Sequence, residues 1–167
     1  MIETIEHNGN IYPKFQSSGN AARFVKSFAE EVCIGYGIDI GCNRMDWCFK
    51  GATPIDPALN EHSAMDIPFV NNSLDYIHSS HCLEHLDDWI RALDYWHSKL
   101  KSSGVMFLYL PDFSQTYWRG WHNTKHRHSF TPKIVGSYFK DQPDLWKNTF
   151  VSGVDLNSSF VCISEKK

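Results

Sequence analysis

Gly37-Ile38-Asp39-Ile40-Gly41-Cys42 is the stretch that decides the fold, together with the shorter Thr53-Pro54-Ile55-Asp56-Pro57. Each is a short apolar run that ends in an acid or a glycine, which is typical of a buried parallel strand whose carboxyl end faces a ligand. A glycine past the first strand lets the backbone approach a bound molecule, and an acid at the tip of the second accepts hydrogen bonds from ribose hydroxyls. The pair predicts a nucleoside-containing cofactor above a parallel sheet.

The spacing of apolar residues predicts how strands and helices follow one another. Helices are expected over residues 21–32, 86–100 and 132–140, with Gly104 as the stop signal of the second. Strands are expected at 36–41, 53–56, 75–79, 105–110, 147–153 and 159–164. We therefore expect an α/β fold: a Rossmann-like, doubly wound, mostly parallel sheet with an antiparallel C-terminal edge hairpin. Residues 1–18 are expected to form an N-terminal arm, and residues 19–167 a single domain.

The amino-acid composition limits which binding partners and which cellular compartment are expected. The 167 residues, 42% of them hydrophobic, suffice for about one domain with its own core. A net charge of −3 gives no basic field, which disfavours long nucleic acids as partners. The five cysteines form no C-x-x-C pair, which favours free thiols in a reducing compartment. No apolar run is long enough to span a membrane and no signal sequence opens the chain, so we expect a cytoplasmic protein without a membrane partner.

A series of segments carries a family resemblance, because their order along the chain fits one pattern. The series comprises Asp39-Ile40-Gly41-Cys42, Asp56, Ala64–Phe69, Asn72–Ile77, Ser79–Leu86 and Leu100–Gly104. With these residues the chain resembles the class I S-adenosylmethionine-dependent methyltransferases, most closely the small type-11 group. The block from Ser79 to Leu86 is the most specific match and corresponds in the family to the loop beneath the methyl donor. The resemblance implies S-adenosyl-L-methionine as the cofactor and S-adenosylhomocysteine as its product.

Carried over residue by residue, the resemblance also implies a cofactor site. It places the methionine end near Asp39 and Gly41, the ribose at Asp56, and the adenine near Met65 and Asp66. The full set of expected cofactor-binding residues is Asp39, Gly41, Cys42, Asn43, Asp56, Met65, Asp66, Ser79 and His81. Gln16 and Gly19 are expected to close over the cofactor from the N-terminal arm.

The glycine loop departs from the family pattern. It reads Gly41-Cys42-Asn43-Arg44-Met45, so only the first glycine of G-x-G-x-G is present. Asn43 tolerates left-handed backbone better than most residues and is expected to replace the second glycine. This departure leaves open an alternative function, a non-catalytic or degenerate S-adenosylmethionine- or nucleoside-binding partner module. A nicotinamide-dependent reductase would require G-x-G-x-x-G at this turn, which the sequence lacks.

Methyl transfer mainly requires alignment and desolvation, because the sulfonium carbon is already activated. A base is needed only where the acceptor must lose a proton. The candidate catalytic residues are His81, Asp112 and His126. The loop 113–131 follows a strand at the ligand-bearing edge, and its candidates for substrate binding are Trp118, Trp121, His122, Lys125 and His128. These side chains fit a small-molecule or glycan acceptor; an alternative is a lid whose tryptophans cover the core.

The segment His81-Cys82-Leu83-Glu84-His85 leaves a metal-binding alternative open. Its H-x-x-E-H pattern matches the inverted zinc-protease signature, but His81 directly follows an expected strand instead of lying in a helix. In some metal-dependent O-methyltransferases an E-x-x-E-H motif occupies this loop. That resemblance would make His81, Glu84 and His85 metal ligands, with a fourth ligand from His126 or His128. The leading interpretation assigns no metal and treats His85 and Glu84 as residues of a helix start.

Overall fold

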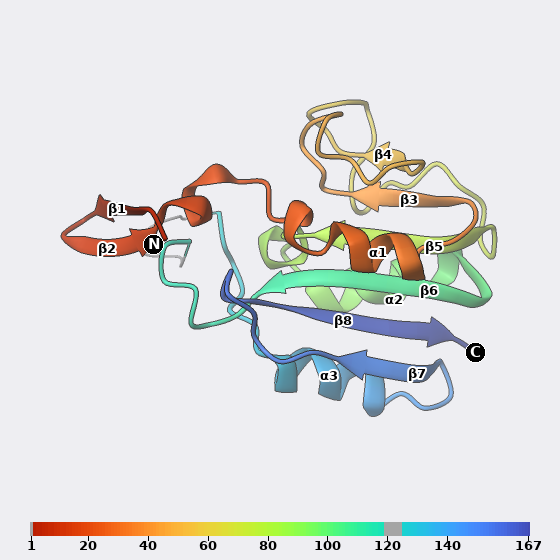
Figure 1. Cartoon of the computed structure of the whole chain (residues 1–167). Coiled ribbons are helices and arrows are strands. Elements are labelled where there is room, and N and C mark those ends of the chain that lie inside the picture. The colour runs from red at the N-terminus through yellow and green to blue at the C-terminus, as the bar shows by residue number, and fades with distance from the viewer. Residues whose placement is uncertain (1, 119–124) are drawn as a thin grey trace.

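The centre of the fold is a six-stranded sheet with the order β4-β3-β5-β6-β8-β7 (Figure 1). The computed structural model describes residues 2–118 and 125–167. The strands of this sheet are β3 Gly37–Ile40, β4 Thr53–Ile55, β5 Leu74–Ser80, β6 Leu100–Pro111, β7 Trp146–Val151 and β8 Ser159–Lys166. β4, β3, β5 and β6 are parallel, whereas β8 is antiparallel to β6 and β7. The expected α/β, Rossmann-like sheet with an antiparallel C-terminal hairpin is confirmed.

Alternating side chains of β6 divide the core into two layers. The sheet is covered by α1 Lys26–Val32, α2 Trp89–Lys99 and α3 Pro132–Lys140. Met106, Leu108 and Leu110 pack in the layer of α2 and α3. Phe107 and Tyr109 pack in the opposite layer with α1, which lies in front of the sheet in Figure 1. Apolar residues on both faces are what a strand buried between helices requires. Among the helices of the described ranges, none has the length and apolar composition needed to cross a membrane.

α2 begins later than the apolar spacing suggested. The side chain of Asp88 accepts a hydrogen bond of 3.0 Å from Arg91 N, and this N-cap starts the helix at Trp89 instead of residue 86. The preceding Leu83–His85 form a separate 3₁₀ turn, η3. The loop after β5 therefore ends in a short turn of its own, which carries Glu84 and His85.

The expected role of Gly104 as a helix stop is wrong. α2 ends at Lys99, and Leu100 is already extended and paired with Leu74 of β5. Gly104 lies within β6, where a Cβ would come within 3.0 Å of the Leu74 carbonyl oxygen. The close approach of two strands, and not the end of a helix, requires glycine here.

The N-terminal segment contains a β-hairpin that was not expected from the sequence. Residues Asn8 and Gly9, with φ of 51° and 74°, form the turn of a hairpin between β1 Thr4–His7 and β2 Asn10–Pro13. Two 3₁₀ turns follow, η1 Lys14–Ser18 and η2 Ala22–Phe24, so the helix expected over 21–32 is reduced to α1. In Figure 1 the hairpin lies beyond the end of the sheet at which the parallel strands finish. The division into an arm at 1–18 and a domain at 19–167 stays a prediction.

Candidate functional site

The carboxyl ends of β3, β4 and β5 meet where the strand order reverses. From β3 the chain continues to β4 on one side and then to β5 on the other side of β3. Such switch points open a crevice for ligands in open α/β sheets. A cavity of about 690 Å³, the size of a small-molecule site, lies there. Gly41, Asp56 and His81 line it, and each is the first residue after its strand.

The loop after β3 turns through two residues with left-handed backbone. Gly41 has a φ of +84° and Asn43 a φ of +61°. A Cβ at Gly41 would lie 2.5 Å from Sγ of Cys82, so the packing of the loop after β5 requires a glycine there. Asn43 takes the left-handed place expected for it. Arg44 and Met45, the other departures from the glycine pattern, do not line the cavity.

Asp56 is held at the cavity wall by backbone donors. Its Oδ2 accepts a hydrogen bond of 2.7 Å from Asn43 N, and its Oδ1 accepts one of 2.8 Å from Ala58 N. Because each carboxylate oxygen has a second lone pair, both oxygens are still able to accept bonds from the hydroxyls of a ribose. The cavity and this acid fit the nucleoside part of the cofactor that the resemblance implies.

Asp39 also lines the cavity, but its carboxylate binds protein groups. Its Oδ1 lies 2.9 Å from Nδ1 of His78, and its Oδ2 accepts a bond of 2.7 Å from Phe49 N. The His78 ring is stacked between Phe49 and Phe107, with ring centroids 4.9 and 5.4 Å away. Asp39 therefore fastens the loop after β3 to the core, and its contact with the methionine end of the cofactor stays a prediction.

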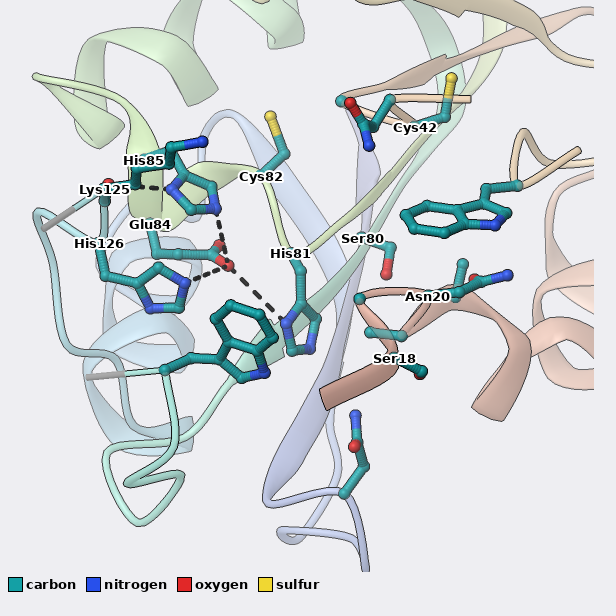
Figure 2. A pocket seen from close by; sticks show the side chains of 18 of the residues that line it. Ser18, Asn20, Cys42, Ser80, His81, Cys82, Glu84, His85, Lys125 and His126 are labelled. Carbon is teal, nitrogen blue, oxygen red and sulfur yellow. Dashed lines mark hydrogen bonds and ion pairs between the residues drawn. The ribbon is translucent and has the colours of Figure 1, made fainter. Parts of the chain in front are cut away.

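A buried carboxylate and three histidines form a second polar group in the same cavity (Figure 2). Glu84 has no exposed surface, and neither carboxylate oxygen has a hydrogen-bond partner among the described residues. Its Oε1 lies 3.7 Å from Nε2 of His85, 3.8 Å from Nδ1 of His81 and 3.9 Å from Nε2 of His126. These distances are too long for hydrogen bonds. The three rings face the carboxylate without bonding to it.

Backbone hydrogen bonds explain how His126 reaches Glu84 from a distant part of the chain. The carbonyl oxygen of Glu84 accepts bonds of 2.8 Å from Arg127 N and 3.2 Å from His128 N. The segment 125–128 is thereby fixed against η3. The backbone of Glu84 thus holds the backbone of the two residues after His126, and this places the His126 ring beside the carboxylate.

Burial shifts the protonation equilibria of this group. It raises the pKa of Glu84 to about 8, because the charged form loses its hydration. Burial, followed by the charges of His126 and His85, lowers the pKa of His81 to about 3. Burial and then His85 lower the pKa of His126 to about 4. Both histidines are therefore neutral at pH 7, and both are weak general bases, since a base works best with a pKa near the operating pH.

Most of the residues expected from the sequence are brought together in this cavity. The expected cofactor-binding residues that line it are Asp39, Gly41, Cys42, Asn43, Asp56 and His81. It is also lined by Gln16 and Gly19 of the N-terminal segment, and by Trp118, Lys125 and His126 after β6. The indole Nε1 of Trp118 donates a bond of 2.7 Å to the Gln16 carbonyl, which joins these two walls.

Three of the expected cofactor-binding residues lie outside the lining. Ser79 is fully buried within β5, where its hydroxyl donates to the carbonyl oxygen of Ile40 over 3.0 Å. Met65 and Asp66 belong to the connection between β4 and β5 and are exposed. Their expected role at the adenine stays a prediction.

Asp112, a candidate catalytic residue, and His128, a candidate for substrate binding, form contacts outside the cavity. Oδ1 of Asp112 accepts a bond of 2.8 Å from Ser114 N, and Nε2 of His128 lies 2.8 Å from the Leu86 carbonyl oxygen. Neither residue lines the cavity. The other two substrate candidates, Trp121 and His122, lie outside the described residues.

Several cavity residues were not expected from the sequence, among them Ser80, Cys82, Gln115 and Asn157. Nε2 of Gln115 donates to the Asn157 carbonyl over 3.1 Å and joins the loop after β6 to the β7–β8 connection. The sequence marks Asn157 only as a turn residue, and no local pattern pairs it with Gln115. Ser80 and Cys82 flank His81 within the matched block, and that adjacency is the signal that could have found them.

The comparisons with known proteins agree with this architecture. The family model of a methyltransferase domain matches residues 18–142. A SAM-dependent methyltransferase from Archaeoglobus fulgidus is 14% identical with a TM-score of 0.62, covering 87% of this chain and 95% of its own. One from Aquifex aeolicus is 11% identical with a TM-score of 0.63, covering 95% and 100%. A Haloferax volcanii methyltransferase, solved with the Trm112 methyltransferase activator, is 13% identical with a TM-score of 0.64, covering 92% and 94%.

At these identities the solved structures show the fold alone, whereas the family model covers most of the chain. No curated protein has a sequence that matches. The family match agrees with the switch-point cavity and with the position of Asp56 at its wall. The chain belongs to the methyltransferase-domain family and is an S-adenosylmethionine-dependent methyltransferase.

Proposed function

We propose that the protein transfers a methyl group from S-adenosylmethionine to a small-molecule or glycan acceptor. The observation that carries this proposal is that one cavity contains both Asp56 and the side chains of the loop after β6. At about 690 Å³ it has the volume of a site for a drug-sized ligand, and the protein has no net positive charge to attract a long nucleic acid.

The residues divide into a cofactor side and an acceptor side. We assign Asp56 to the ribose hydroxyls, and Gly41 and Asn43 to the backbone that approaches the cofactor. We assign Trp118 and Lys125, which line the cavity, to the acceptor. An aromatic ring and an ammonium group in one cavity fit a sugar-like or anionic molecule.

S-adenosylmethionine, when bound, supplies an activated methyl carbon. The protein then has to align the acceptor with that carbon and exclude water. His81 and His126 have pKa values of about 3 and 4, so neither is suited to removing the acceptor's proton at neutral pH, and we assign His81 to orienting the acceptor. The unpaired state of all five cysteines supports a cytoplasmic location.

The alternative function is a non-catalytic module that binds S-adenosylmethionine or a nucleoside. It was favoured by the missing glycines of the loop after β3. In the structure Asn43 supplies the left-handed turn, and Arg44 and Met45 leave the cavity free. Among the described residues, the departures from the glycine pattern therefore place no side chain in the cavity that would favour this alternative.

Detection of S-adenosylhomocysteine tests the proposal. The purified full chain is incubated with S-adenosylmethionine and separate panels of hydroxylated small molecules, oligosaccharides, RNA and peptides. We expect turnover with a member of the first two panels, and a raised KM for that acceptor in Trp118→Ala. Turnover only with RNA or peptides would overturn the acceptor class. Cofactor binding without turnover on any panel would support the non-catalytic module instead.

A further inference from the structure

We propose that Glu84, His85 and His126 form a binding site for a divalent transition-metal cation, with Zn²⁺ as the best fit. Figure 2 shows their carboxylate and ring nitrogens turned toward a common point beside the cavity. The three residues come from η3 and from the loop after β6, which backbone hydrogen bonds already hold together.

Glu84 has no hydrogen-bond partner among the residues that the structure describes. The side chain is fully buried, and neither oxygen accepts a hydrogen bond from any of these residues. Leaving a buried carboxylate unpaired is costly, and native proteins pair such groups or let them coordinate metals. A cation between Glu84 and the surrounding lone pairs would supply the partner that these residues do not.

The ligand atoms of these three residues lie close together. One such atom from each of Glu84, His85 and His126 lies within 4.8 Å of the other two. In a tetrahedral site with bonds of about 2.0–2.1 Å, neighbouring ligand atoms lie about 3.3 Å apart. Oε1 of Glu84 is 3.7 Å from Nε2 of His85 and 3.9 Å from Nε2 of His126. These two spacings are already within about 0.6 Å of the tetrahedral value, and the spacing between His85 and His126 is at most 4.8 Å.

The His85 ring is oriented so that one nitrogen faces Glu84. Its Nδ1 lies 2.9 Å from the carbonyl oxygen of Lys125, which accepts hydrogen bonds and donates none. The ring proton is thereby assigned to Nδ1, so Nε2 carries the lone pair and faces Glu84. Metal-binding histidines are held in this way, with the far N–H bonded to a carbonyl or carboxylate.

His81 borders this site without belonging to the group of three. Its Nδ1 is 3.8 Å from Oε1 of Glu84, and its Nε2 lies 3.0 Å from Oγ of Ser159. We assign it a place beside the metal, as a hydrogen-bonding neighbour. Three protein ligands then leave one coordination position open, which is the arrangement of catalytic zinc sites.

The ligand types select the ion. Two imidazoles and one carboxylate suit Zn²⁺ and its transition-metal neighbours, whereas Mg²⁺ and Ca²⁺ prefer oxygen ligands throughout. A second group of potential ligands, Asp39, Cys42 and Cys48, carries no such proposal. Both oxygens of Asp39 already contact protein nitrogens, and no member of that cluster is among the unpartnered buried groups of the described residues.

The position of the metal narrows the acceptor to one that presents a hydroxyl group. Glu84, His85 and His126 line the same cavity as Asp56, so the open coordination position shares the space of the methyl donor. A cation at this site would lower the pKa of a hydroxyl group bound to it and would make that oxygen a nucleophile at neutral pH. The hydroxyl acceptor rests on the proposed function, whereas the metal site rests on geometry alone.

Metal titration of the full chain tests the site. Protein stripped with a chelator is titrated with Zn²⁺ by calorimetry and with Co²⁺ by visible absorption. We expect one ion per chain and the cobalt spectrum of a low-coordinate nitrogen and oxygen site. Glu84→Gln and His126→Asn should each weaken affinity by at least about tenfold, since even outer-sphere changes cost about 10–100-fold. His62→Asn, a histidine outside the cavity, is the matched control and should bind as the wild type does.

Two results would overturn the metal site. One is a folded wild-type chain that binds neither ion at stoichiometric concentrations; the other is unchanged affinity in both ligand variants. If Glu84→Gln does not fold, His126→Asn decides, because its side chain comes from a loop. Calorimetry of S-adenosylmethionine with the stripped protein runs in parallel. Cofactor binding without metal binding rejects the metal site alone, and metal binding without cofactor binding rejects the proposed function alone.

Discussion

The backbone N–H of Asn43 donates a hydrogen bond of 2.7 Å to Oδ2 of Asp56, and so joins the tips of β3 and β4. This bond sets the acid of one strand against the left-handed turn of the other, at the switch point of the sheet. The two sequence segments that predict the fold are thus in direct contact in the structure. The proposed cofactor site depends on that contact.

Asp56→Ala should weaken S-adenosylmethionine binding by about 1–3 kcal/mol, because the ribose hydroxyls and Asn43 N lose their acceptor. Calorimetry of the variant measures the change. Asp144→Ala, which removes an exposed acid far along the chain, is the control and should bind normally. Equal affinities in the two variants would show that Asp56 is not the ribose acid.

Asn43→Val should lower the free energy of unfolding by about 1–3 kcal/mol, since a β-branched residue is strained at a φ of +61°. Asn43→Gly should fold at least as well as the wild type, because glycine adopts this backbone freely. Chemical denaturation of both variants gives the comparison. A valine variant as stable as the glycine variant would contradict the left-handed turn.

Gly41→Ala should cost about 2–5 kcal/mol, because it combines a φ of +84° with a Cβ only 2.5 Å from Sγ of Cys82. Gly51→Ala is a matched control. Gly51 has a φ of +87°, but a Cβ there meets no atom within 4 Å, so only backbone strain is added. Thermal unfolding should therefore show the larger loss at Gly41. Similar losses at both positions would mean that Cys82 does not pack as described.

Asp39→Ala should lower stability by about 2–4 kcal/mol, because Phe49 N and His78 both lose a buried partner. Asp75→Ala, at an exposed ion pair with Lys101, should cost much less. Urea unfolding distinguishes them. A loss of cofactor affinity in Asp39→Ala with unchanged stability would instead place this acid at the ligand.

The sequence predicts the fold well because the decisive residues are local. Five strands of the main sheet lie close to their expected ranges, whereas β6 begins at Leu100 instead of residue 105; α3 occupies the expected residues 132–140. The hairpin around Asn8 and Gly9 was missed although the Asn-Gly pair is a strong turn signal. The start of α2 was misplaced because apolar spacing continues through η3, and only the Asp88 cap marks the boundary.

The site is only partly predictable from the sequence, because its second half depends on contacts between distant segments. Gly41, Asp56 and His81 follow strands whose ends meet in any parallel sheet. The sequence left His126 and His128 as equal candidates beside Glu84. The structure distinguishes them, since His126 faces that carboxylate and His128 contacts Leu86 instead. No local pattern contains that information.

Calorimetric titration of the wild-type chain with S-adenosylmethionine and S-adenosylhomocysteine tests the central claim most directly. The switch-point cavity predicts one binding site for each ligand, with the two ligands competing. Absence of binding for both at millimolar concentration, by a chain shown to be folded, would contradict it.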